Sequence, residues 1–140
     1  MKKIQLFILT KSVGLYLNLL SFIQPEKAKN KAYSLFSQPR KGKIRASKFP
    51  KTLESAEKEV FQTYIWRVNE EIILLVHGWE SNSSRWKKLL PHLFKTGKTI
   101  IAIDAPAHGL STGKEFNAPS YATYINGLTK KYNPSILIGH

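Results

Sequence analysis

The feature that most constrains the fold is an alternation of apolar runs and amphipathic segments along the second half of the chain. The apolar runs cover residues 73–76 (ILLV), 99–103 (TIIAI) and 135–138 (SILI). Their continuous hydrophobicity is typical of strands buried on both faces. Between them, residues 86–94 and 121–128 place apolar side chains on one helix face. This order of strands and helices predicts an α/β fold with a mostly parallel sheet and right-handed crossovers.

Upstream of this region the residue spacing predicts further elements that end in a basic connector. Apolar spacing, prolines and β-branched residues indicate helices at residues 4–23, 26–37 and 51–59, a short strand at 43–46 and a strand at 61–68. We therefore expect two regions: a basic helical N-terminal extension over residues 1–50, and one domain over residues 51–140.

The charge of the chain is concentrated in its first third. The 140 residues carry 22 Lys and Arg against 9 Asp and Glu, a net charge of +13, and residues 1–50 account for +10 of it. No nucleic-acid motif accompanies these charges, so no specific nucleic-acid partner is expected. The absence of cysteine excludes disulfides, a thiol nucleophile and thiolate zinc sites.

Residues 4–23 form an apolar segment that could have several roles. The stretch before Lys11 is too short for a normal signal-peptide core, and no small-x-small cleavage pattern precedes Pro25. The segment is long enough to span a bilayer, but a central lysine costs roughly 2.5–3.5 kcal/mol on insertion scales. We expect an amphipathic helix that packs on the domain or makes peripheral membrane contact through residues 1–23. A cytoplasmic location follows, with an anchor or uncleaved signal as the alternative.

Polar residues and glycines follow each of the three predicted parallel strands. The first strand is followed by His77-Gly78-Trp79, the second by residues 104–111 (DAPAHGLS), and the third by Gly139-His140. In open α/β sheets ligands bind outside the carboxyl ends of the strands. These segments are therefore expected to meet at one edge of the sheet and to form the functional site.

These motifs together resemble the first half of an α/β-hydrolase domain, over about residues 61–140. The resemblance rests on LLVHGW, on a tryptophan in the next helix, on AIDAPAHGLS and on the final ILIGH. It implies that Gly139 and His140 are the first two positions of the family's G-x-S-x-G nucleophile elbow, with the serine next. A full-length protein would cleave a small-molecule ester, amide or related bond through that serine, without a cofactor. The 140-residue chain itself is expected to be inactive, because nucleophile, acid and base would all follow His140.

The resemblance also implies roles for the residues after the first strand. The backbone N–H of Trp79 would be one donor of the oxyanion hole. Gly78 would allow the chain to turn so that this N–H points into the site. His77 is expected to hold the loop by hydrogen bonding.

The loop after the second strand resembles the family's D-x-P-G-H-G-x-S segment. Asp104 is expected to cap the turn and His108 to connect neighbouring loops, with Gly109 in the same structural role. Ala107 stands where the family usually has glycine. Ser111 has no base near it in the sequence and is interpreted as a turn residue.

Two other functions remain open from the residues alone. His77, Asp104, His108 and His140 all follow strands and are acceptable Zn²⁺ or Mn²⁺ ligands, so a metal-dependent hydrolase is one alternative. The other is a non-catalytic binding module that contacts a membrane or nucleic acid through residues 1–50.

Overall fold

The computed structural model describes residues 2–45, 51–54, 56–59 and 62–140. The chain divides into two compact units, one ending at Ser37 and the other running from Gln38 to His140. The division therefore lies before the basic connector, whereas the sequence places it after residue 50. Residues of the connector are hydrogen-bonded to loops of the second unit, as described below.

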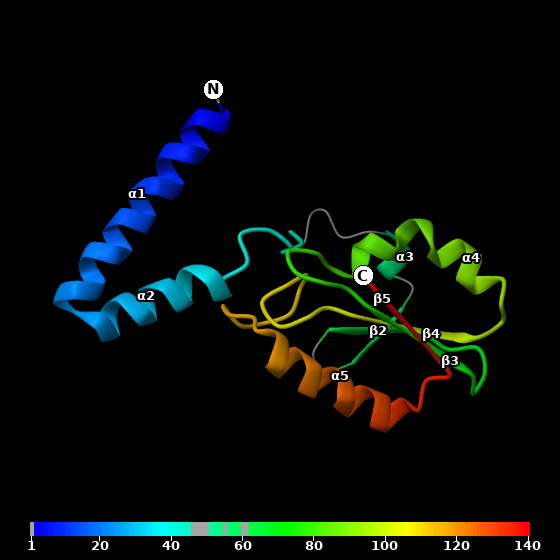
Figure 1. Cartoon of the computed structure of the whole chain (residues 1–140). Coiled ribbons are helices and arrows are strands. Elements are labelled where there is room, and N and C mark those ends of the chain that lie inside the picture. Colours follow the sequence, from blue (N-terminus) through cyan, green and yellow to red (C-terminus); the bar gives the residue numbers. More distant parts are fainter. Residues whose placement is uncertain (1, 46–50, 55, 60–61) are drawn as a thin grey trace. The chain divides into compact units, whose positions relative to one another are not determined.

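The second unit is built around a five-stranded mixed sheet (Figure 1). Its strands are β1 (Glu57–Glu59), β2 (Thr63–Trp66), β3 (Ile72–Val76), β4 (Thr99–Ile103) and β5 (Ile136–Gly139). They are arranged in the order β1-β2-β4-β3-β5. The β3–β4 and β3–β5 pairs are parallel, as predicted, whereas β1–β2 and β2–β4 are antiparallel. Strand β3 therefore lies between β4 and β5, which aligns the carboxyl ends of these three strands.

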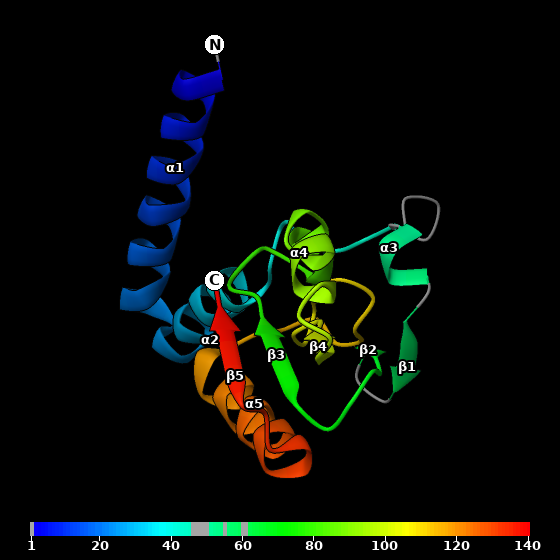
Figure 2. The same cartoon turned by 90° about the vertical axis from the view of Figure 1, so that its right-hand side faces the viewer.

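Helices cover both faces of the sheet (Figure 2). On one face, the 3₁₀ helix η2 (Ser83–Lys88) and α4 (Leu90–Phe94) pack over a core that includes Tyr64, Ile73, Leu75, Trp86, Leu90 and Ile100. On the other, α5 (Ala118–Tyr132) covers a core that includes Ile65, Leu74, Val76, Ile101, Ile103 and Tyr121. Alternate residues of each central strand thus enter opposite cores, which explains their unbroken apolar runs.

Three predicted elements differ from the structure. The helix predicted at residues 86–94 is divided into η2 and α4, because Pro91 lacks the N–H that a continuous helix would use at that point. The helix predicted at 51–59 is limited to α3 (Lys51–Glu54), and β1 follows it. The predicted strand near residue 43 is a single bridge between Lys43 and Gly109. Ala46 and Phe61, the outer ends of two predicted strands, lie outside the described residues.

Strand β5 is not buried on both faces, contrary to its apolar sequence. It pairs with β3 on one side and forms an edge of the sheet. Ile136 and Leu137 are 43% and 50% exposed, and only Ile138 packs partly against the core. An apolar run therefore identified the strand correctly but not its degree of burial.

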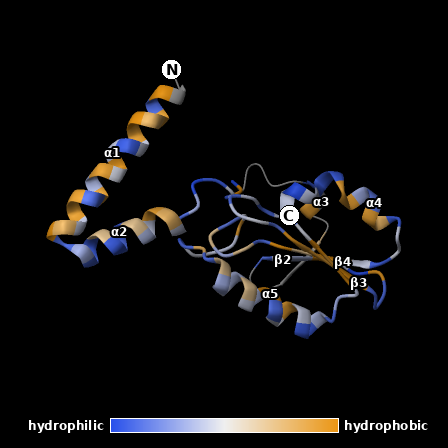
Figure 3. Cartoon of the chain, in the orientation of Figure 1, coloured by the Kyte–Doolittle hydropathy of each residue, from blue (hydrophilic) through white to orange (hydrophobic). Residues whose placement is uncertain are grey.

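The first unit consists of two helices, α1 (Lys2–Ile23) and α2 (Pro25–Ser37). They meet at Gln24, whose N–H donates to Leu20 O and whose carbonyl accepts from Ala28 N. Figure 3 shows apolar residues along the whole of α1. Ile4–Ile23 is apolar and long enough to cross a membrane, and none of this window is buried inside the protein. The expected amphipathic pattern, with apolar residues confined to one face, is not what α1 presents.

Candidate active site

The carboxyl ends of β3 and β5 lie directly against each other. The His140 N–H donates to Val76 O at 3.0 Å, which continues the parallel pairing to the last residue. A Cβ atom at Gly78 would lie 2.5 Å from His140 O. Position 78 can therefore hold only glycine in this backbone arrangement, and the segment after β3 touches the chain where it leaves β5.

The backbone N–H of Trp79 lies one residue beyond this contact. No hydrogen bond joins it to any residue in the part of the chain that the structure describes. The next residue, Glu80, is in the left-handed conformation (φ 50°), and its N–H donates to His108 Nε2 at 3.0 Å. The Glu80 carboxylate accepts from Arg40 N at 3.0 Å. The turn that presents the Trp79 N–H is thus fixed by hydrogen bonds at its following residue.

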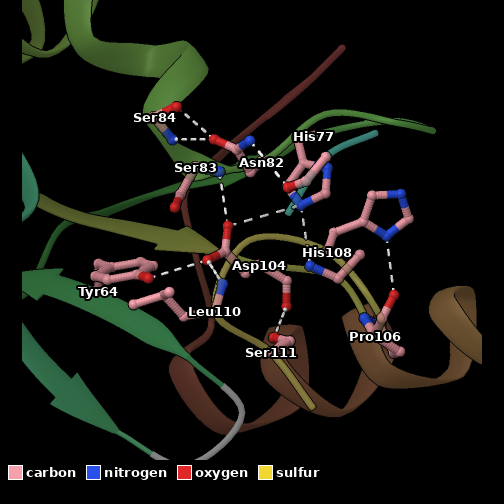
Figure 4. A network of polar contacts seen from close by, with 12 residues as sticks. Tyr64, His77, Asn82, Ser83, Ser84, Asp104, Pro106, His108, Leu110 and Ser111 are labelled. Carbon is pink, nitrogen blue, oxygen red and sulfur yellow. Dashed lines mark hydrogen bonds and ion pairs between the residues drawn. The ribbon is translucent and has the colours of Figure 1, made fainter. Parts of the chain in front are cut away.

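The Asp104 carboxylate is the central acceptor of the loops at this edge (Figure 4). Its Oδ1 accepts from Ser83 N at 2.7 Å, and its Oδ2 accepts from Tyr64 Oη at 2.9 Å and Leu110 N at 3.0 Å. The residue is 1% exposed. Three donors stabilise this buried charge and connect β2, η2 and the loop after β4 to one side chain. Burial raises the pKa of the Tyr64 hydroxyl, and the nearby Asp104 carboxylate raises it further.

Two residues of the loop after β4 have left-handed backbones. Gly109 (φ 50°) lies against the Asp104 carboxylate, and a Cβ atom there would be 1.9 Å from Oδ2. Ala107 also has a positive φ, 62°, and its N–H donates to Thr112 O at 2.9 Å. Ala107 stands where the D-x-P-G-H-G-x-S segment has its first glycine, and it adopts the backbone conformation that glycine favours. This conformation has a steric cost of about 1 kcal/mol for alanine.

The two histidines of the site are buried, neutral connectors. His77 Nε2 accepts from Ala105 N at 3.0 Å, which assigns the proton to Nδ1, where it is donated to Gly78 O. His108 accepts from Glu80 at Nε2 and donates from Nδ1 to Pro106 O. Burial lowers the pKa of both imidazoles and outweighs the Asp104 charge, which raises it. His77 Nε2 lies 3.9 Å from Asp104 Oδ1, but a neutral ring forms no charge pair there.

These lowered pKa values predict a loss of stability at mildly acidic pH. In the unfolded chain the imidazoles titrate near pH 6.5, so below that pH the unfolded state binds more protons than the folded state. The free energy of unfolding should fall by up to about 1.4 kcal/mol per pH unit for each histidine as the pH drops below 6.5. Urea unfolding between pH 7.5 and 5.5, followed by tryptophan fluorescence, measures this. An unchanged midpoint would contradict the neutral assignment.

Several residues that contact the site lie outside the sequence motifs. Tyr64 comes from β2, and the connector adds Gly42, whose carbonyl accepts from Gly109 N at 2.7 Å. Ile44 N donates back to Gly109 O at 3.0 Å. Arg85 contacts the His140 ring through its guanidinium. These partners are distant in sequence and lie outside any motif, so sequence patterns offered no signal for them.

Ser111 and the two histidines proposed as alternative metal ligands, His77 and His108, have other hydrogen-bond partners. The Ser111 hydroxyl donates to Asp104 O at 2.7 Å and has a structural setting. Among the residues that the structure describes, no three His, Cys, Asp or Glu side chains are grouped to hold a metal ion. The hydrogen bonds of His77 and His108 already engage both nitrogens of each ring. This geometry does not support the metal-dependent alternative.

The sheet is partly parallel and has helices on both faces, which defines an α/β protein. Its candidate site is formed by the polar loops at the carboxyl ends of the strands. Residues 71–135 match the family model described as alpha/beta hydrolase fold. The match covers 65 of the 140 residues, and together with the fold it shows that this part of the chain is similar to the alpha/beta hydrolase fold. No curated protein matches the chain in sequence.

Proposed function

We propose that the protein is a serine hydrolase that, in its full-length form, cleaves an ester, amide or related bond of a small molecule. The observation that carries this proposal is the Trp79 N–H, which has no partner among the described residues and lies one residue beyond the Gly78–His140 contact. A backbone donor kept available at a strand end suits an oxyanion that forms there during acyl transfer.

The residue that follows His140 is the proposed nucleophile. Because His140 O lies against position 78, the chain leaves β5 beside the segment that carries the Trp79 N–H. A serine there would place its hydroxyl and an oxyanion donor on the same side of a substrate carbonyl. One such donor stabilises the transition state by roughly 2.7–4 kcal/mol. The second donor would be the N–H of the residue after the serine.

In this proposal His77 and His108 hold the loops of the site and do not act as its general base. Each uses both ring nitrogens for backbone hydrogen bonds, at His77 to Ala105 and Gly78, and at His108 to Glu80 and Pro106. A general base needs an unoccupied nitrogen within reach of the nucleophile. The proposal therefore assigns His77, Asp104, His108 and Gly109 to positioning the loops. The catalytic acid and base would follow the nucleophile, in the family's chain order.

The test uses the protein extended beyond His140 in its own reading frame. A fluorophosphonate probe should label the serine directly after His140, and replacement of that serine by alanine should abolish labelling. Gly78→Ala should slow labelling by on the order of 10²-fold, because the new Cβ displaces the oxyanion segment from the strand end.

Gly127→Ala is the matched control, since a Cβ at that helical glycine meets no atom within 4 Å. It should label at the original rate. A residue other than serine after His140, or labelling that is indifferent to Gly78→Ala, would overturn the proposal.

A further inference from the structure

We propose that α1 crosses a lipid bilayer and anchors the protein, with the basic residues after it at the headgroups of anionic lipids. The length of the helix fits this role. Its 22 residues extend about 33 Å at 1.5 Å per residue, close to the roughly 30 Å of a hydrocarbon core. The window Ile4–Ile23 has a mean hydropathy of 1.7, and none of it is buried inside the protein.

The distribution of side chains around α1 favours a spanning helix over one that lies in the membrane surface. At 3.6 residues per turn, its aliphatic and aromatic residues other than Phe7 cover roughly 220° of the circumference. The polar and small residues gather mainly in the remaining stripe, at Thr10, Lys11, Gly14, Asn18 and Ser21. A surface-lying helix has a strongly polar face and low net hydrophobicity. The exposed Phe22, Leu15, Leu9 and Leu6 span roughly 200° of the helix circumference, which is too wide for such an arrangement.

The serine and threonine hydroxyl groups of α1 donate to the backbone of the helix itself. Thr10 donates to Leu6 O at 2.7 Å, and Ser12 donates to Ile8 O at 2.8 Å. Ser21 likewise donates to its own helix, within one turn. In hydrocarbon no water can accept these protons, so hydroxyls are tolerated only where the backbone accepts them.

Lys11 is the main cost of insertion, and the apolar residues outweigh it. A lysine near the bilayer centre costs roughly 2.5–3.5 kcal/mol. Residues 4–23 contain 12 Leu, Ile, Val and Phe. Each favours membrane insertion by roughly 0.3–0.6 kcal/mol near the helix centre, so together they favour it by about 5 kcal/mol on the same scale. Lys11 Nζ also lies 5.6 Å from the centre of the Phe7 ring, which gives the ammonium a partner on its own helix.

The charges on the two sides of α1 indicate its orientation. Two lysines precede the apolar window, whereas Lys27, Lys29, Lys31, Arg40, Lys41, Lys43 and Arg45 follow it within 22 residues, against Glu26 alone. Excess positive charge marks the cytoplasmic flank of a membrane helix. Lysines near an anionic surface contribute about 1 kcal/mol each. The α/β unit would therefore lie on the cytoplasmic side.

The test is expression of the full chain in bacterial cells, followed by extraction of the membranes at alkaline pH with carbonate. The chain should stay in the membrane pellet with its full mass. Leu9→Arg combined with Leu17→Arg places two charges in the centre of α1 and should release most of the protein. Ala122→Arg with Asn126→Arg adds the same charge at exposed positions of α5 and should leave it in the pellet. Lys11→Leu should remain bound.

Orientation is read from Lys29→Cys, which is the sole thiol because the chain has no cysteine. A membrane-impermeant maleimide should label it in inverted membrane vesicles and not in intact spheroplasts. Release of the original chain by carbonate, a mass that shows cleavage after α1, or labelling in intact spheroplasts would each overturn the proposal.

Discussion

Replacing Asp104 by alanine should destabilise the second unit by about 4 kcal/mol or more. The substitution leaves the Ser83 N–H, the Leu110 N–H and the Tyr64 hydroxyl without their shared acceptor. Each buried donor without a partner costs roughly 1–3 kcal/mol. Because a typical domain is stable by only 5–15 kcal/mol, this is a large fraction of the total.

Urea unfolding of the full chain in mild detergent measures this change. Trp66, Trp79 and Trp86 all belong to the second unit, so tryptophan fluorescence reports its unfolding. Tyr64→Phe removes one donor and keeps the carboxylate, so it should cost only about 1.5–3 kcal/mol. Equal unfolding midpoints for Asp104→Ala and the original protein would show that the carboxylate does not hold these loops together.

Gly109→Ala should lower the free energy of unfolding by about 3–5 kcal/mol, which is comparable to the effect of Asp104→Ala. The cause is a steric clash. The new Cβ would lie 1.9–2.3 Å from three atoms of the Asp104 carboxyl group, at a residue with φ 50°. The carboxylate cannot move aside without losing its donors. Backbone hydrogen bonds with Gly42 and Ile44 also restrain Gly109. Overpacking and left-handed strain therefore add to each other.

Gly97→Ala is the matched control for Gly109→Ala. Gly97 also has a positive φ, 68°, but a Cβ there meets nothing within 4 Å. It should show the backbone strain alone, about 1–2 kcal/mol. The same unfolding measurement applies to both variants. If they lose equal stability, the contact between Gly109 and Asp104 contributes nothing beyond the backbone conformation.

The sequence was most informative where residue pattern and burial coincide. The run at residues 99–103 was predicted as a strand and is β4 over the same residues, because every one of its side chains is buried. The run at 135–138 is similarly apolar, yet β5 is exposed at the edge of the sheet. Hydrophobicity reports that a segment can be buried, whereas its place in the sheet depends on pairing. Likewise, apolar spacing at 86–94 located the helical segment but not its division at Pro91.

The candidate site was predictable only in part, for a related reason. The loops after β3, β4 and β5 could be assigned to one edge, because parallel strands end on the same side. The Tyr64 donor could not, since it comes from the antiparallel β2, 40 residues before Asp104. The hydrogen bonds of residues 42 and 44 to Gly109 also lie outside any motif. The roles implied for Trp79, His77 and His108 stay predictions that the proposed experiments address.

The order of the strands also has a consequence for the chain during its synthesis. Strands β1–β4 all precede residue 104, and the donors to Asp104 are complete at Leu110. A nascent chain can therefore form four paired strands and its buried polar centre before α5 and β5 leave the ribosome. Because synthesis proceeds from the N-terminus, these four strands are the first part of the sheet available for pairing. Strand β5 then adds to an existing β3 edge, across a separation of 63 residues between Ile73 and its partner Ile136.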